Sequence, residues 1–392
     1  MQALFSKSLQ YRFMNEQTGA LSSKQHKLFG LDHLRALAII MVFIYHYGRI
    51  FPHPEWTNAI SVFGWTGVDL FFVLSGYLIA SQLFASLVKA GTFSLKEFFI
   101  KRSFRILPAY FTVVSFYFLF PFLREHEALA PLWKYITFTQ NIGLDLRTQG
   151  TFSHAWSLCV EEQFYLFFPL LLLFFHYCKI LRKGLWFLLI LFFFGFAARL
   201  YSWHGLVQPH AGQDDFWVYW QEWIYYPTWC RLDGLLAGVS IAALFQYQPR
   251  IKEWIQQHGN AFLIAGLIIE TIAYFLCVNQ QTFSASVFGF PLVDFGYGLL
   301  VIGAISPETF LYKTQSRTTT KIAALSFALY LTHKIIIHQT QEQLGKFNVN
   351  KESNLMFFIC VVTCLAGAIL LNLIVERPFL KWRNRLLKRM LV

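Results

Sequence analysis

Charged side chains are scarce in this chain. Only 14% of its 392 residues are Asp, Glu, Lys or Arg, whereas a soluble domain carries about 25%. Apolar residues make up 56%, and Phe alone occurs 44 times. This composition argues against a large soluble protein and favours a polytopic membrane protein with Phe on its lipid-facing surfaces.

Redox, metal and processing signals are also lacking. The six cysteines include no Cys-x-x-Cys pair, and we expect them to be small hydrophobic helix residues rather than disulfide partners or metal ligands. The first 28 residues are polar and hold no apolar signal-peptide core, so the first span is expected to direct insertion itself. Internal repeats, low-complexity tracts and linkers are absent, which favours one domain.

Long apolar runs are what the chain does contain. About 20 apolar residues cross a bilayer core. We therefore predict an all-α polytopic membrane bundle of about ten transmembrane helices, near residues 33–50, 60–82, 106–122, 156–177, 185–201, 231–247, 260–278, 288–306, 322–340 and 354–375. The stretch 131–142 is too short to span, so we expect it to lie in the interface or to re-enter.

The basic residues predict an orientation. The net charge of +12 comes from Lys and Arg clustered in alternate short segments between spans, and the positive-inside rule explains this better than a nucleic-acid partner. Both termini are thus expected in the cytoplasm. We predict a cytoplasmic tail over residues 1–30, a transmembrane domain over 31–378 and a basic cytoplasmic tail over 379–392.

Arg35 and His46 are the most informative pair. They are eleven residues apart in the first span, which is three helical turns plus about 20°, so both lie on one face about 16 Å apart along the axis. An ionisable residue inside a span is costly and predicts a functional site. A cation near the start and an imidazole deeper in suit an elongated anionic ligand whose reactive end lies in the membrane.

Further charged residues accompany the next spans. Arg102 and Arg105 are spaced i, i+3, which places two guanidinium groups side by side, suitable for phosphate, although positive-inside flanking is an equal alternative. Pro108 predicts that the third span begins close to it. Asp69 is expected near the centre of its span, facing a partner or a cavity. Gly76 is expected to allow close helix approach.

The fourth span carries Glu161, Glu162 and Tyr165 near its predicted outer end. Adjacent carboxylates differ by about 100° around a helix, so only one of them is expected to face the bundle interior. A buried carboxylate near a histidine can orient the imidazole and stabilise its cation. The ordinary alternative is that both glutamates lie at the headgroup level.

The later spans add three candidates. Arg231 and Asp233 begin the sixth span, and an i, i+2 ion pair is geometrically poor in a helix, so each is expected to pair with another span. His333 lies within its span and could line the same cavity as His46 or make a structural hydrogen bond. The loops 123–155 and 202–230 are rich in Trp and Tyr, which predicts an interfacial belt or, alternatively, a platform for sugar rings.

Eight motifs occur in order between about Asp32 and Pro378: LDHLRALAIIMVFIYH, GVDLFFVLSGYLIA, FFIKRSFRILPAYF, the pair Gln140-Asn141, WSLCVEEQFYLFFPL, RLDGLLAG, FALYLTHK and ERPF. This ordered set resembles the membrane-bound acyltransferase-3 family. Members of that family include bacterial O-acetyltransferases of lipopolysaccharide, exopolysaccharide and peptidoglycan.

The resemblance implies residue roles. His46 would be catalytic, and Arg35, Arg102 and Arg105 would bind acyl-coenzyme A. Glu161 would be the better of the two glutamates, and with Asp69 it would orient His46. The remaining predicted substrate-binding residues are Tyr165, Arg231, Asp233 and His333.

The expected reaction moves an acyl group, with acetyl favoured, from acyl-coenzyme A to a hydroxyl of a surface saccharide such as lipopolysaccharide O-antigen. It would occur in a multi-pass protein of a bacterial inner membrane, in contact with lipid and without a metal. An imidazole with an ordinary pKa of about 6.5 can take the hydroxyl proton near neutral pH. Direct transfer and an acyl-histidine intermediate both remain open.

The alternative function is a saccharide or lipid transporter or flippase without covalent chemistry, although no repeat of broken helices supports it.

Overall fold

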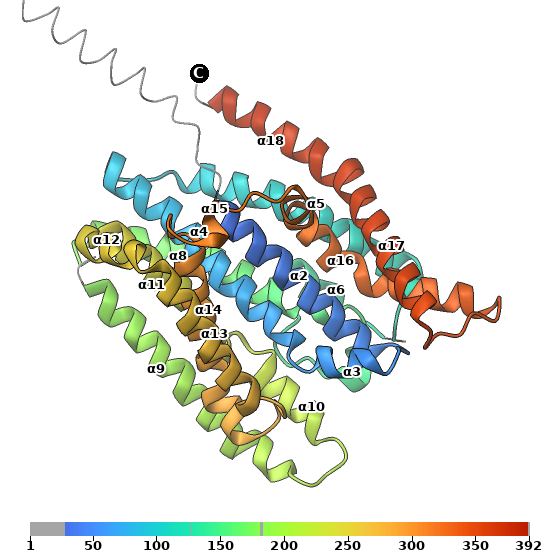
Figure 1. Ribbon diagram of the computed structural model, residues 1–392. Coiled ribbons are helices and arrows are strands. Elements are labelled where there is room, and N and C mark those ends of the chain that lie inside the picture. Colours follow the sequence, from blue (N-terminus) through green and yellow to red (C-terminus); the bar gives the residue numbers. More distant parts are fainter. Residues whose placement is uncertain (1–27, 127, 181–182, 391–392) are drawn as a thin grey trace, which may run out of the picture.

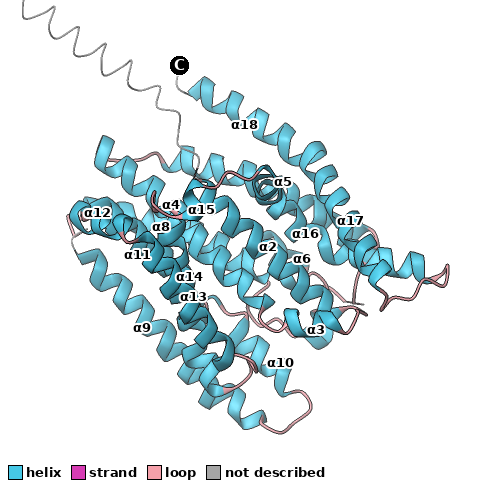
Figure 2. Ribbon diagram, viewed as in Figure 1, coloured by secondary structure: helices cyan, strands magenta, loops and turns pink. Residues whose placement is uncertain are grey.

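The computed structural model describes residues 28–126, 128–180 and 183–390. Every regular element within these ranges is helical, as Figure 2 shows. The predicted tail over residues 1–30 lies almost wholly outside them. The predicted basic tail from residue 379 lies mostly in an amphipathic helix, α18 (Arg377–Met390).

In the described part of the chain, ten long helices overlap the ten predicted spans (Figure 1). They are α2 (Phe29–Ile50), α4 (Gly67–Ala90), α5 (Leu95–Leu119), α8 (Trp156–Tyr177), α9 (Gly184–Ser202), α11 (Asp233–Tyr247), α13 (Gly259–Leu276), α14 (Phe290–Ala304), α16 (Arg317–Gly345) and α17 (Asn354–Leu371). Within the described ranges, eight helical segments are long and apolar enough to cross a membrane. The other two are α5, which begins with a charged segment, and α11, which has only 15 residues. The all-α polytopic bundle is thereby confirmed.

Short helices connect the long ones. They are α3 (Trp56–Ser61), α6 (Leu132–Ile136), α7 (Leu146–Gln149), α10 (Phe216–Trp220), α12 (Pro249–Gln257) and α15 (Phe310–Lys313), with 3₁₀ turns η1 (Gly64–Thr66), η2 (Pro121–Leu123), η3 (Ser153–Ala155), η6 (Gln208–His210) and η8 (Thr228–Cys230), and π turns η5 (Trp203–Val207), η7 (Gln221–Tyr225), η9 (Ala285–Gly289) and η10 (Asn372–Glu376).

Glycine contacts bring α4 and α11 together at the centre. A Cβ added to Gly76 would lie 2.2 Å from the carbonyl oxygen of Leu235, and one added to Gly238 would lie 2.2 Å from that of Val73. Only residues without a side chain allow the two backbones to approach this closely. The predicted packing role of Gly76 is confirmed.

Two predicted boundaries are wrong. α5 begins at Leu95, where the Ser94 side chain caps the helix, and Pro108 lies inside it. The hydropathy pattern missed the first turns because they are charged. The chain also breaks before Gly67, so Asp69 lies in the first turn of α4 rather than at the centre of a span.

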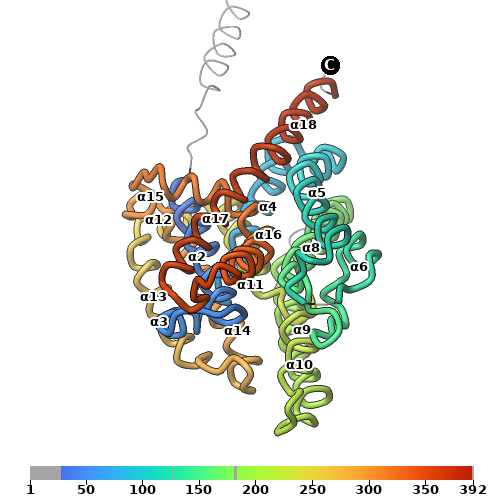
Figure 3. Tube along the Cα trace, turned by 90° about the vertical axis from the view of Figure 1, so that its right-hand side faces the viewer, coloured from blue at the N-terminus to red at the C-terminus, as the bar shows by residue number. Residues whose placement is uncertain are grey.

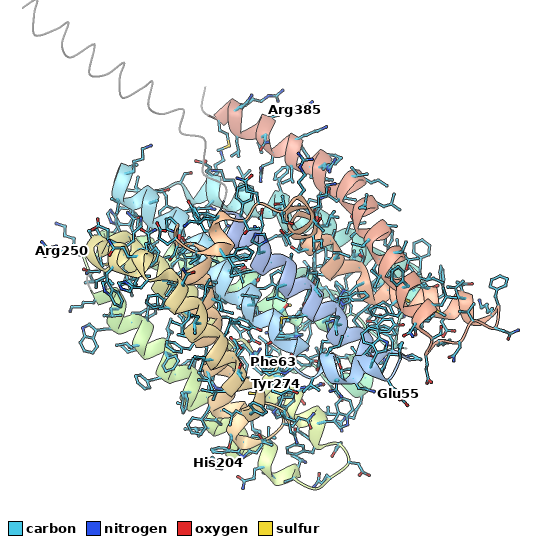
Figure 4. The ribbon with its side chains drawn as sticks, viewed as in Figure 1. Glu55, Phe63, His204, Arg250, Tyr274 and Arg385 are labelled. Carbon is cyan, nitrogen blue, oxygen red and sulfur yellow. The ribbon has the colours of Figure 1, made fainter. Side chains whose placement is uncertain are left out.

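The bundle has two distinct ends. Figure 4 labels Arg250 and Arg385 toward one end, which we call the basic end, and Glu55 and His204 toward the other, the loop end. α2 starts at the basic end, where His33 Nε2 donates to the Thr314 carbonyl oxygen at 2.9 Å. α18 points to the basic end and α10 lies at the loop end in both views (Figures 1 and 3).

Candidate active site

α2 connects two clusters of polar residues. Arg35 lies toward its start at the basic end, and His46 lies toward its finish at the loop end. The helical rise separates them by about 16 Å along the axis. Each residue belongs to a different cluster, and the two clusters differ in charge and in lining.

The first cluster contains the three predicted phosphate-binding arginines. Arg35 is within electrostatic range of both Arg102 and Arg105. The Arg105 Nη1 atom lies 3.4 Å from Glu376 Oε2, and the side chains of Arg35 and Arg105 remain 36% and 35% exposed. α2 and α5 therefore present three guanidinium groups together at the basic end. The cluster has the charge and the access that an anion requires.

A fourth arginine was missed by the sequence reasoning. Arg383, on α18, is within electrostatic range of Arg102 and Arg105. Ring contact between Trp382 and Phe104, with centroids 5.2 Å apart, holds α18 against α5. Its basic amphipathic pattern was interpreted as a tail, and only the folding of α18 back onto α5 reveals the proximity.

Glu161 and Tyr165 also join this first cluster. The Glu161 carboxylate accepts hydrogen bonds from the Ser75 hydroxyl and the Tyr165 hydroxyl, both at 2.9 Å. The Arg102 guanidinium lies 5.2 Å from the centre of the Tyr165 ring. α8 turns Glu161 toward α4 and the arginines, so the expectation that Glu161 orients His46 has no contact among the described residues to support it.

The second cluster surrounds His46. The Nδ1 atom of His46 lies 2.8 Å from Nε2 of His333, and both rings are buried. The ring of His154 is 5.7 Å from that of His46 and 5.0 Å from that of His333, centre to centre. Of the two expected roles of His333, the structure supports the structural hydrogen bond, and His333 is not among the residues that line the cavity beside His46. His154 was missed, although it lies only two residues before the fourth predicted span.

A cavity of about 380 Å³ opens beside His46. His154, Lys334 and His126 border it, and aromatic side chains form much of its wall: Tyr45, Trp65, Trp156, Trp217, Tyr225, Tyr226 and Tyr330. Trp217, Tyr225 and Tyr226 come from the loop 202–230, whereas the loop 123–155 contributes His126 and His154. Both loops thus fold over the cavity, and these three aromatic residues line it rather than only forming an interfacial belt.

Amide side chains hold the loops in place. Asn141 donates to the Tyr226 carbonyl oxygen at 3.1 Å and to the Thr228 hydroxyl at 2.9 Å. Gln163 on α8 donates to the Asn141 side-chain oxygen at 3.1 Å. The stretch 131–142 contains only the five-residue α6 and does not span, as predicted.

A buried ion pair completes the cavity wall. Lys334 Nζ lies 2.9 Å from Glu125 Oε1, and the two side chains are 1% and 2% exposed. The Phe152 backbone N–H also donates to this carboxylate at 3.1 Å. Burial raises the pKa of Glu125, but the Lys334 ammonium and the hydrogen bonds outweigh it, so that the pKa is below its usual range. A lysine inside a span was the overlooked signal.

Asp69 and Asp233 pair with arginines of other segments. Asp69 Oδ1 lies 2.5 Å from Arg231 Nη2, with both side chains 1% exposed, and Asp233 pairs with Arg199. The predicted pairing of Arg231 and Asp233 with other spans is confirmed. None of these four residues borders the cavity, so the expectation that Asp69 orients His46 has no contact to support it.

Within the described ranges, no group of three or more His, Cys, Asp or Glu residues is arranged to hold a metal ion. Nε2 of His333 faces Nδ1 of His46, while Nδ1 of His333 and Nε2 of His154 both face the Tyr330 carbonyl oxygen. The arrangement therefore provides a base, a set of cations and an aromatic cavity.

Comparison with known proteins identifies the family. An acyltransferase-domain family model matches residues 28–373. The chain belongs to the acyltransferase-3 family. This acyltransferase-3 chain is 27% identical over 404 residues to a candidate O-acetyltransferase of Staphylococcus aureus strain MRSA252, covering 95% of the chain and 61% of the relative.

A second relative is the O-acetyltransferase OatA of Staphylococcus aureus strain NCTC 8325, with 29% identity over 328 residues, 79% of this chain and 50% of the relative. The acyltransferase-3 chain thus spans between half and about three fifths of the length of these relatives. No solved structure matches it.

Proposed function

We propose that this chain is an integral-membrane O-acyltransferase that moves an acetyl group from acetyl-coenzyme A to a hydroxyl of a bacterial cell-surface saccharide. Family membership and the O-acetyltransferase relatives support the reaction class. The observation that carries the proposal is that one helix, α2, contributes an arginine to a cationic cluster and a histidine to an aromatic cavity.

The donor would bind from the basic end. Coenzyme A carries phosphate groups, and guanidinium groups match phosphate oxygens in paired hydrogen bonds. Arg35, Arg102 and Arg105 are the proposed phosphate ligands, with Arg383 adding charge. The pantetheine arm would then follow α2 toward His46. The excess of basic residues makes this end cytoplasmic under the positive-inside rule.

His46 would act as the base. Its imidazole takes the proton of the acceptor hydroxyl while the oxygen attacks the thioester carbonyl carbon. The tetrahedral intermediate then collapses, the carbon–sulfur bond breaks, and the coenzyme A thiolate leaves and recovers the proton from His46. The products are the ester and free coenzyme A, and no other reactant is needed.

The acceptor would enter from the loop end. A cavity of about 380 Å³ falls within the usual range for small-molecule sites. Its indole and phenol rings offer flat apolar faces with polar edges, which suit the faces of sugar rings. We therefore propose a saccharide acceptor on the outer side of an inner membrane.

Sealed vesicles of known orientation test this function. Radiolabelled acetyl-coenzyme A supplied at the basic face should label a glycan on the opposite face, and donor supplied to that opposite face should give no label. His46→Gln keeps hydrogen bonding but removes the base, so it should abolish labelling at normal abundance. His204→Gln, a change at the loop end outside the cavity lining, is the matched control.

Two outcomes would contradict the proposal. Wild-type labelling by His46→Gln would remove His46 from the chemistry. Movement of an unmodified saccharide without acetyl transfer would instead indicate a transporter.

A further inference from the structure

Backbone carbonyl groups fix the proton positions in the histidine pair. The Nδ1 atom of His333 lies 2.8 Å from the Tyr330 carbonyl oxygen and 3.0 Å from that of Leu329. A carbonyl oxygen can only accept a hydrogen bond. The network therefore assigns the His333 proton to Nδ1, and its Nε2 atom carries a lone pair.

This assignment propagates to His46. The lone pair on His333 Nε2 faces His46 Nδ1 at 2.8 Å, so His46 Nδ1 must carry the proton that is shared between the rings. In a neutral imidazole the other nitrogen then has the lone pair. The contact with His333 engages Nδ1, and the His46 ring borders the cavity.

We infer that His333 is a positioning residue that holds His46 in the Nδ1–H tautomer, with the basic Nε2 atom directed to the acceptor hydroxyl. The inference rests on the proposed function of His46 and adds a role for a residue on another helix. It replaces the direct substrate contact expected for His333, because both of its ring nitrogens already have partners inside the protein.

The chemical step at His46 on α2 therefore depends on His333, a residue of α16. In serine proteases a carboxylate fixes the histidine tautomer, and loss of that acceptor reduces kcat strongly. Here the neutral imidazole of His333, which is hydrogen-bonded to the backbone of α16, fixes the tautomer of His46 without introducing a charge. The Val42 backbone also hydrogen-bonds the His46 ring, so loss of His333 weakens the hold on this tautomer rather than removing it. A larger fraction of His46 then adopts the tautomer whose Nε2 is protonated and cannot accept a proton.

A pair of variants of equal length isolates this effect. His333→Gln has the reach to place a carbonyl oxygen close to the original Nε2 position, whereas His333→Met offers only a weak sulfur acceptor. We expect His333→Met to lower kcat about 100-fold, in the range of a general base, and His333→Gln to stay within roughly tenfold of wild type. The donor KM should not change in either variant, because the arginine cluster lies about 16 Å away along α2.

His338→Gln is the matched control, since His338 lies on the same helix but not in the cavity lining. It should behave as wild type. Equal kcat values for the Gln and Met variants at wild-type abundance would overturn the inference while leaving the proposed function intact. An inactive wild-type protein would instead defeat the proposed function.

A measurement on the unmodified protein covers the case in which neither variant folds. Nitrogen-15 NMR of histidine-labelled wild-type protein in lipid distinguishes protonated from unprotonated ring nitrogens. The His46 signals are assigned by their loss in His46→Gln. We expect a protonated Nδ1 and an unprotonated Nε2 on His46. A protonated Nε2 on neutral His46 would refute the inference.

Discussion

The buried ion pair between Asp69 and Arg231 should determine stability rather than chemistry. Asp69 Oδ1 and Arg231 Nη2 are 2.5 Å apart, and both side chains are 1% exposed. The Arg231 guanidinium also lies 4.1 Å from the centre of the Phe290 ring. Removing one partner leaves the other charge unpaired inside the bundle, which costs about 3–5 kcal/mol.

The surroundings decide where in this range each variant falls. In Asp69→Asn the remaining guanidinium keeps Asp294 within electrostatic range, so we expect a loss of about 3 kcal/mol. Arg231→Met leaves Asp69 unpaired and also removes the cation–π contact with Phe290, so we expect about 5 kcal/mol. The double variant Asp69→Leu/Arg231→Met removes both charges and should lose less than the sum of the two.

The assay compares folding with turnover. Unfolding of purified protein in detergent gives the stability, and acetyl transfer per folded molecule gives kcat. Asp69→Asn should unfold more easily and retain near-wild-type kcat in its folded fraction. Asp145→Asn is the matched control, because Asp145 pairs with an Arg147 side chain that is 44% exposed, and surface pairs contribute only about 0–1 kcal/mol.

One result would refute this reasoning. If Asp69→Asn had wild-type stability and no turnover, Asp69 would act in catalysis, and its contact with Arg231 would be incidental.

Two further predictions concern the donor site and the helix packing. Arg105→Ala should raise the donor KM roughly 10–100-fold and leave kcat unchanged, because it loses a charged hydrogen bond worth about 1.5–3 kcal/mol. The control Arg250→Ala should not alter the donor KM. An unchanged donor KM in Arg105→Ala would exclude Arg105 from phosphate binding. Gly76→Val should force α4 away from α11 and destabilise the bundle by about 1–3 kcal/mol or more, as measured by unfolding in detergent. The control Gly205→Ala should be tolerated, because a Cβ at Gly205 meets no atom within 4 Å. Equal stability of the two variants would contradict the close contact between α4 and α11.

The sequence determined the features that depend on local order. Hydropathy over about 20 residues located the spans, because each must bury its own backbone polar groups in a helix. Helical periodicity placed Arg35 and His46 on one face and set Arg102 beside Arg105. Small residues marked where backbones could touch, as Gly76 does with Leu235.

Tertiary structure decided which residues of different spans meet. Charge alone required Asp69 to have a partner, but it did not say that Arg231 would be that partner or that Glu161 would lie with the arginines. Likewise, His46 faces His333 instead of a carboxylate. Such pairings depend on helix rotation and crossing, which are set by packing over the whole bundle and leave no periodic signal in the chain.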